Sequence, residues 1–144
     1  MVRVTLAAAA LTAGAITRAV PRVMRTLRMR SRIQMALNSS DPDVVLEGQV
    51  AQHIGASNVE RFQDEIHVDG RRVGEIDVQT STMVVEVTNG SGAGTGRQLR
   101  RLISERQSSL VGRELVLFAP NITSGRRRHW SGLGIRVVRS LDEL

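Results

Sequence analysis

Apolar and polar side chains alternate along two short segments in the middle of the chain. In residues 73–80, and again in residues 83–88, every second side chain falls on the same side of an extended backbone, and β-branched residues are enriched. A period of two with this composition predicts the two strands of an antiparallel hairpin. Each segment places one acidic residue between apolar neighbours, Asp77 in the first and Glu86 in the second.

These two carboxylates have two interpretations. A carboxylate held among strand residues loses hydration, so it tends to be protonated, paired or bound to a cation. Two facing carboxylates repel each other unless a divalent cation lies between them. Alternatively, Asp77 and Glu86 lie on the solvent-exposed face of an ordinary hairpin, and alternation alone does not distinguish the two.

A helical period precedes the hairpin. Residues 43–54 predict a helix, with Asp41 or Ser40 as its N-cap and Pro42 in its first turn. Glu47 is the one acidic member of the apolar stripe of this helix. The other members are Val44, Val50, Ala51 and Ile54. Either Glu47 reaches a partner across the fold, or it lies at the edge of the stripe and points to water.

The rest of the chain predicts further strands and helices. The expected elements are a strand at 58–68 that ends in an Asp69-Gly70 turn, a helix after the Gly-rich segment 90–96, a buried central strand at 114–119, a short loop or helix at 124–131, and a last strand at 135–138. The order is helix, three-strand meander, helix, strand, short helix, strand. This order predicts a mixed α/β fold with one core.

The two acidic strands carry a family resemblance. The run Gly74 to Val78, Gly-Glu-Ile-Asp-Val, is followed after a short gap by Val84 to Thr88, Val-Val-Glu-Val-Thr. This pair resembles the core of the PD-(D/E)xK nuclease superfamily, and especially the carboxy-terminal nuclease toxin domains of bacterial contact-dependent and polymorphic toxin systems. The resemblance covers residues 44–139. It implies an αβββαβ restriction-endonuclease-like core, with a central mixed sheet flanked by helices.

The resemblance also implies a metal-dependent active site. Asp77 and Glu86, with the main-chain carbonyl of Val87, match the ligands of a Mg²⁺ or Mn²⁺ ion. Glu47 matches a first-helix glutamate that reaches the metal site. Gln98 matches a glutamine or lysine near the start of the next core helix, which in the resembled family points at the active site. The alternative interpretation is that Gln98 is an exposed polar residue of that helix.

Thr88 stands where the resembled family has a catalytic lysine, and the chain contains no lysine, because all 20 of its Lys and Arg residues are Arg. Such a lysine orients the attacking water and stabilises developing charge. Three accounts remain. A nearby arginine (Arg97, Arg100 or Arg101) supplies the charge, the metal ion does most of the work, or catalysis is lost and a nucleic-acid-binding or repair-accessory protein remains on a decayed nuclease scaffold.

Composition argues against several other chemistries. The chain has no cysteine, which removes disulfides, thiol nucleophiles and cysteine-based zinc sites. His53, His67 and His129 have no metal-ligand spacing, which disfavours a zinc hydrolase. Aromatic residues make up 2% of the chain, which disfavours base stacking as the main mode of binding. The Gly-rich segment 90–96 lacks the Lys-Ser/Thr ending of a phosphate-binding loop.

Positive charge is concentrated at the start of the chain. Residues 1–40 contain seven Arg and no acidic residue, whereas residues 41–144 contain thirteen Arg and fourteen acidic residues, a net charge of −1. Within this second part, two arginine clusters suit phosphate contacts or form solvated faces. They are Arg97, Arg100 and Arg101, and Arg126, Arg127 and Arg128.

Residues 1–37 predict a basic, Ala-rich amphipathic leader, and residues 38–144 the nuclease-like domain. An apolar stripe of the leader consists of Ile16, Val20, Met24 and Leu27. Pro21 is expected to interrupt it. Such a segment lies on an anionic membrane surface or takes part in translocation, contacts nucleic acid, acts as a secretory signal, or is a disordered linker or fragment boundary.

The expected function is therefore a metal-dependent endonuclease, a bacterial toxin domain that hydrolyses tRNA or DNA in the cytoplasm after secretion or delivery into a target cell. By the resemblance, its partners are nucleic acid and a cognate immunity protein, and residues 1–37 add a membrane contact. The alternative outside the nuclease class is a membrane-associated structural or repair-accessory protein whose main feature is the leader.

Overall fold

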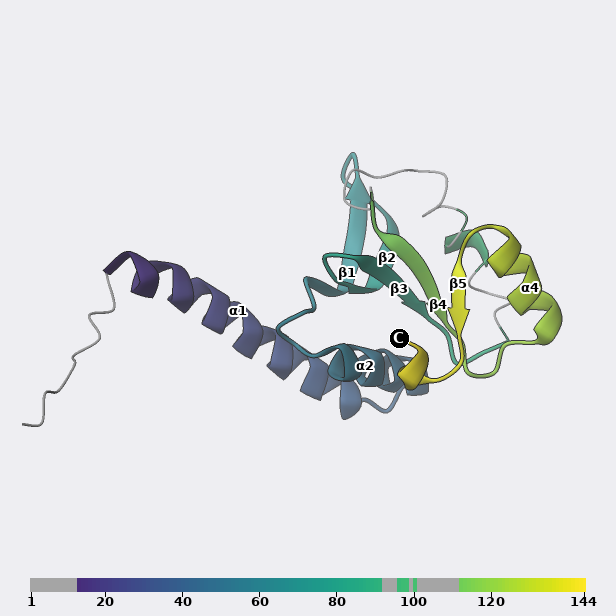
Figure 1. Ribbon diagram of the computed structural model, residues 1–144, viewed down its shortest axis with the longest axis horizontal. Helices are drawn as coiled ribbons and strands as arrows, with labels where there is room; N and C mark the ends of the chain where they lie inside the picture. The colour runs from purple at the N-terminus through teal and green to yellow at the C-terminus, as the bar shows by residue number, and fades with distance from the viewer. Residues whose placement is uncertain (1–12, 92–95, 99, 101–111) are drawn as a thin grey trace, which may run out of the picture.

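The alternating segments form part of a mixed five-stranded sheet that is flanked by helices (Figure 1). The computed structural model describes residues 13–91, 96–98, 100 and 112–144. Its elements are α1 (Ala13–Leu37), α2 (Pro42–Ile54), β1 (Arg61–Val68), β2 (Arg71–Gln79), β3 (Met83–Val87), β4 (Glu114–Phe118), α4 (Ser124–Gly132), β5 (Arg136–Val138) and a 3₁₀ turn, η1 (Leu141–Glu143). Residues 96–98 and 100 are helical as well.

The strands follow the order β1-β2-β3-β4-β5 across the sheet. The first three run antiparallel to one another, and β3, β4 and β5 run parallel. A parallel neighbour requires a crossover connection, and the segments between β3 and β4 and between β4 and β5 provide it. The expected mixed α and β fold with a central mixed sheet is confirmed.

The start of the domain follows from local capping. The side chain of Asp41 accepts a hydrogen bond of 2.9 Å from the Asp43 N–H, and Pro42 occupies the first turn of α2, so the predicted N-cap is confirmed. β1 begins at Arg61 and not at residue 58 as expected. Residues 56–58 form a turn after α2, and the Asn58 side-chain amide donates to the Ile54 carbonyl in this turn, so the strand begins only after it.

The turn between β1 and β2 confirms the hairpin expected at this point. Asp69 and Gly70 have φ values of 49° and 75°, the pair of positive values that a tight two-residue turn requires.

β4 is the central strand that the continuous apolar run predicts. Val116 and Phe118 belong to a core cluster shared with α1 and α2, whereas Leu117 packs on the other side in a cluster with Trp130 of α4. The expectation of a strand covered on both faces is confirmed.

The carboxy-terminal half of α1 belongs to the same core as the sheet, although the sequence analysis treated residues 1–37 as a leader. Met29, Ile33 and Ala36 are buried in the cluster that contains α2. The helix continues through Pro21, so the expected interruption was wrong. Pro21 is exposed, so water can bond the carbonyl that a proline leaves unpaired. Among the described residues, no helix combines the length and hydropathy needed to cross a bilayer.

α1 and α2 approach closely because α2 has a glycine at the contact. A Cβ added at Gly48 would lie 3.0 Å from the Leu37 backbone nitrogen and 3.1 Å from the Ala36 Cβ. Backbone atoms cannot move away as the end of a flexible side chain can, so the two helices would have to separate.

We therefore expect Gly48→Ala to lower the free energy of unfolding by about 1–3 kcal/mol, as overpacking does. Gly125→Ala is the matched control, because a Cβ there meets no atom within 4 Å and gains about 0.5–1 kcal/mol of helix propensity in α4. Urea unfolding of both variants measures the difference. If the Gly48→Ala and Gly125→Ala variants had equal free energies of unfolding, the close approach of α1 and α2 would be contradicted.

Candidate functional site

The candidate site lies where β2 and β3 separate. The ladder between them is short, and its last partners before the separation are Val78 and Val85. The next residues along the two strands are Asp77 and Glu86. Beyond this point β2 pairs with β1 alone, and β3 continues beside β4.

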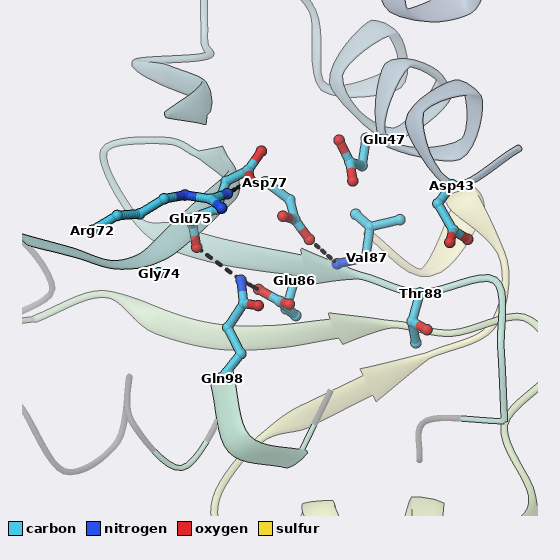
Figure 2. Close-up of a pocket in the computed structure, with 10 residues that line it drawn as sticks. All are labelled: Asp43, Glu47, Arg72, Gly74, Glu75, Asp77, Glu86, Val87, Thr88 and Gln98. Atoms are coloured by element: carbon cyan, nitrogen blue, oxygen red, sulfur yellow. Dashed lines mark hydrogen bonds and ion pairs between the residues drawn. The ribbon is translucent and has the colours of Figure 1, made fainter. Parts of the chain in front are cut away.

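A cavity of about 450 Å³ opens at this fork, beside the first half of α2 (Figure 2). We call it the acidic cavity. Its lining consists of Asp43, Glu47, Arg72, Gly74, Glu75, Asp77, Glu86, Val87, Thr88 and Gln98. All six residues that the sequence analysis assigned to the catalytic and metal positions are in this set. They come from α2, β2, β3 and its end, and the helical residues 96–98, so the fold brings together residues that are far apart in sequence.

Asp77 and Glu86 are buried. Asp77 is 6% exposed and Glu86 5% exposed, so the alternative of an ordinary solvent-facing hairpin surface was wrong. One carboxylate oxygen of Asp77 accepts a 2.7 Å hydrogen bond from the Val87 N–H. Glu86 accepts a 3.1 Å bond from the Gln98 amide, which also donates to the Glu75 carbonyl at 2.9 Å. Gln98 therefore points into the cavity, as Figure 2 shows, and not to solvent.

Burial and neighbouring negative charges raise the pKa values of both acids. Burial raises the pKa of Asp77 to about 8, with the Val87 hydrogen bond opposing it and the charges of Glu47 and Glu75 adding to it. Burial also raises the pKa of Glu86 well above its usual range, and the charge of Asp77 raises it further. Neither acid forms an ion pair with a described residue. The pair therefore holds protons near neutral pH or takes up a cation.

Glu47 faces the strand ends from α2, as Figure 2 shows, and it is half-buried. Burial raises its pKa, and a hydrogen bond from the Gln63 amide, 2.7 Å to one carboxylate oxygen, lowers it in part. The expectation that Glu47 reaches across the fold agrees with this position. The alternative, an edge residue pointing to water, does not account for its partner.

Gln63 holds Glu47 from an irregular point in β1, and sequence reasoning missed it. The pairing with β2 keeps one register on both sides of Gln63, but the φ of Gln63 is 49°, a value that residues other than glycine rarely adopt. Arg32 of α1 secures this point, since its guanidinium donates to the Phe62 carbonyl and pairs with Asp64 at 3.0 Å. No pattern in the sequence signals the positive φ.

Arg72 is the one basic residue among those that line the cavity, and it too was missed. Its guanidinium pairs with Glu75 at 2.7 Å and with Glu65 at 3.0 Å. Arg72 lies in a strand, far in sequence from both arginine clusters, and no sequence pattern indicated that it lines the cavity. Thr88 also lines the cavity, and its hydroxyl accepts a 3.3 Å hydrogen bond from the Gly90 N–H.

The two arginine clusters lie elsewhere. Arg97 and Arg100 are exposed, and Arg100 lies over the Trp130 ring with its guanidinium carbon 6.0 Å from the centroid. Arg126 donates to the backbone and hydroxyl oxygens of Ser91. The exposed Arg127 and Arg128 are the remaining described members, and the prediction for Arg101 falls outside the described residues. None of the described cluster arginines lines the acidic cavity, so the account in which Arg97 or Arg100 supplies the missing charge lacks a contact.

The cavity presents oxygen donors of the kind that Mg²⁺ and Mn²⁺ prefer. In the part of the chain that the structure describes, no three acidic or histidine side chains are grouped closely enough to hold a metal ion as they stand. Two buried carboxylates without a basic partner nevertheless fit a hard divalent cation by their chemistry, because such an ion offsets their repulsion.

Comparison with known proteins finds no relative of this chain. The chain matches no protein-family model, no curated protein and no solved structure.

The raised pKa of Asp77 predicts how stability depends on pH. The unfolded chain releases this proton near pH 4 and the folded protein near pH 8, so unfolding releases a proton between these values. The contribution of Asp77 to the free energy of unfolding should therefore be greatest at low pH and fall as pH rises from about 4 to about 8, by a few kcal/mol. Urea titrations in a chelator measure it. Asp77→Asn should make this slope shallower, with the remainder coming from Glu47 and Glu86, and the exposed Asp142→Asn should keep it; an equal slope in all three proteins would contradict the burial.

Removal of the Gln63 amide should raise the pKa of Glu47 further, because the hydrogen bond that lowers it is lost. A carbon-13 NMR titration of the Glu47 carboxyl measures this in Gln63→Ala. Gln63→Gly serves as a second variant, since glycine adopts a φ of 49° without strain. Gln49→Ala, on the exposed side of α2, is the control. An unchanged pKa in both Gln63 variants would refute the contact.

Proposed function

We propose that this protein is a divalent-cation-dependent nuclease related to the PD-(D/E)xK superfamily. One observation carries the proposal. Two buried carboxylates, Asp77 and Glu86, stand at the fork of two strands in a cavity, and neither has a basic partner among the described residues. Burying such a pair costs stability, and a site for a cation is a functional reason to keep it.

The topology supports the proposal. An α-helix, an antiparallel three-strand meander and a fourth strand parallel to the third, reached through helical residues at 96–98, follow the order that the restriction-endonuclease-like core implies. The two acidic residues stand on the second and third strands of the meander, as that resemblance requires. This agreement supports the relationship through the arrangement of elements and not through sequence identity.

In the proposed site, Asp77, Glu86 and the Val87 carbonyl would hold Mg²⁺ or Mn²⁺. The ion, when bound, would neutralise negative charge at the phosphate and lower the pKa of a bound water. Gln98 fixes the Glu86 carboxylate through its amide. Glu47 has a raised pKa and faces the same cavity, so it is suited to accept a proton from the attacking water or to orient it.

Arg72 takes the place of the missing lysine in this proposal. Thr88 offers a hydroxyl but no charge, whereas Arg72 brings a cation to the cavity lining. An arginine stays protonated, so Arg72 would bind the scissile phosphate electrostatically and would not act as a base. Its pairs with Glu65 and Glu75 hold the guanidinium at this position.

The biological setting is part of the same proposal and depends on the resemblance. It comprises a bacterial toxin domain that acts on tRNA or DNA in the cytoplasm of a target cell and a cognate immunity protein that covers the acidic cavity. An immunity protein for this cavity would present basic side chains, because the lining carries five carboxylates and one arginine.

A second candidate is a binding protein on a decayed nuclease scaffold. The specific observation in its favour is Thr88 at the lysine position, together with acidic side chains that are not grouped closely enough to hold an ion as they stand. This candidate predicts nucleic-acid binding without strand cleavage.

Incubation of the full chain with tRNA, single-stranded DNA and duplex DNA, with and without Mg²⁺ or Mn²⁺, tests the proposal. We expect metal-dependent cleavage of at least one substrate, and a loss of about 100-fold or more in Asp77→Asn and in Glu86→Gln. Glu114→Gln is the matched control, because this exposed acid pairs with Arg136 away from the cavity. Its activity should equal that of the wild type.

Thermal unfolding separates the two candidates, because an ion that binds the folded state raises its stability. A metal-dependent rise in Tm that Asp77→Asn abolishes, together with cleavage, supports the nuclease. The same rise with nucleic-acid binding and no cleavage favours the decayed scaffold. If Tm does not rise with the metal ion and no substrate is cleaved, the proposed metal site is overturned.

A further inference from the structure

The exposed apolar side chains of the protein are concentrated on α1. Among the described residues, six large apolar side chains are exposed, and five of them belong to this helix. They are Val20, Val23, Met24, Leu27 and Met35. Single exposed apolar residues need no explanation, but a group on one element marks an interaction surface.

Four of these residues form one continuous stripe. Val20, Val23, Met24 and Leu27 follow the spacing of three, four and seven residues that places side chains on the same side of a helix. Their exposed fractions run from 47% to 55%. We call them the apolar stripe of α1. Met35, 72% exposed, falls on the same half of the helix at about 100° per residue.

The apolar stripe faces away from the domain. Met29, Ile33 and Ala36, which pack in the core, fall on the opposite side of the helix from Leu27 at about 100° per residue. The amino-terminal part of α1 also extends beyond the sheet and α2, as Figure 1 shows. The stripe and the domain are therefore on opposite sides of the same helix, and a flat surface can reach the stripe without meeting the domain.

The charges around the stripe have one sign. Arg28 and Arg30 flank it on its two sides, and Arg22 and Arg25 point to the other half of the helix. None of these four forms an ion pair with a described residue. Residues 1–40 contain no acidic side chain. An occupant of this surface must therefore be apolar at the stripe and anionic around it.

We propose that α1 lies on an anionic lipid surface, with the apolar stripe at the boundary of the acyl chains. Arg28 and Arg30 extend their charged ends to lipid phosphates on either side, and the domain stays on the water side of the helix. Anionic headgroups complement the arginines, and the acyl boundary complements the stripe.

Two other occupants fit less well. A second copy of the chain would bring two segments of seven arginines and no acid side by side, and their repulsion opposes such a pair. Nucleic acid offers phosphates to the arginines, but its surface offers the stripe no acyl-like region. Of these three occupants, an anionic lipid surface is the one that meets both requirements.

Co-sedimentation of the full chain with vesicles tests the proposal. We expect the partition coefficient for vesicles of phosphatidylserine and phosphatidylcholine to exceed that for phosphatidylcholine alone by tenfold or more. The double variant Val23→Asp/Leu27→Asp should lose tenfold or more of this partition. Leu133→Asp is the matched control, because Leu133 is exposed to 49%, as Leu27 is to 50%, but follows α4. It should bind as the wild type does.

Circular dichroism confirms that each variant is folded before it is compared. Equal partition of the wild type and the double variant would overturn the proposal, as would equal binding to both vesicle types. A dimer by light scattering that the double variant disrupts would assign the stripe to a second copy and overturn it as well. Binding to nucleic acid that competes fully with anionic vesicles and is insensitive to the double variant would assign the surface to phosphates alone.

Discussion

The burial of two carboxyl groups, at a point where a sheet opens, is the constraint on which the rest of this structure depends. Asp77 and Glu86 are the residues at which β2 leaves β3, and both are buried. Neutral neighbours hold them by hydrogen bonds, from the Val87 N–H and the Gln98 amide, and no described base relieves their charge. The fold accepts this cost at the fork of β2 and β3, where the acidic cavity opens.

The surrounding parts of the molecule keep the acids in position. Glu47 is presented by α2 and bonded by Gln63, and Gln63 stands at a backbone irregularity that Arg32 of α1 secures. A chain of contacts thus runs from the amino-terminal helix through β1 to the acidic cavity. Arg72 is held at the cavity by two further acids, Glu65 and Glu75. The cavity therefore depends on contacts from α1, α2 and three strands, and not on the two acidic strands alone.

Sequence patterns predicted the elements and the carboxylates of the site, because both have local signatures. The hairpin follows from alternation around Asp77, the start of α2 from its cap at Asp41, and the central strand from a continuous apolar run. Gln63 and Arg72 had no such signature. The position of Gln63 depends on a positive φ and on a contact with α1, and that of Arg72 on two acids that its long side chain reaches across the strands. The arginine clusters lie outside the acidic cavity, where Arg100 contacts Trp130 and Arg126 contacts Ser91, and their phosphate contacts stay a prediction.

The packing of α1 has a practical consequence for dissecting this chain. A fragment that begins at residue 38, where the composition changes, would lack Met29, Ile33 and Ala36 from the core and would leave the close approach at Gly48 facing water. It would also lack Arg32, so the irregular point of β1 would lose its anchor. Any shortened version made for biochemistry should therefore retain the last three turns of the first helix, or the isolated remainder will report on a damaged molecule.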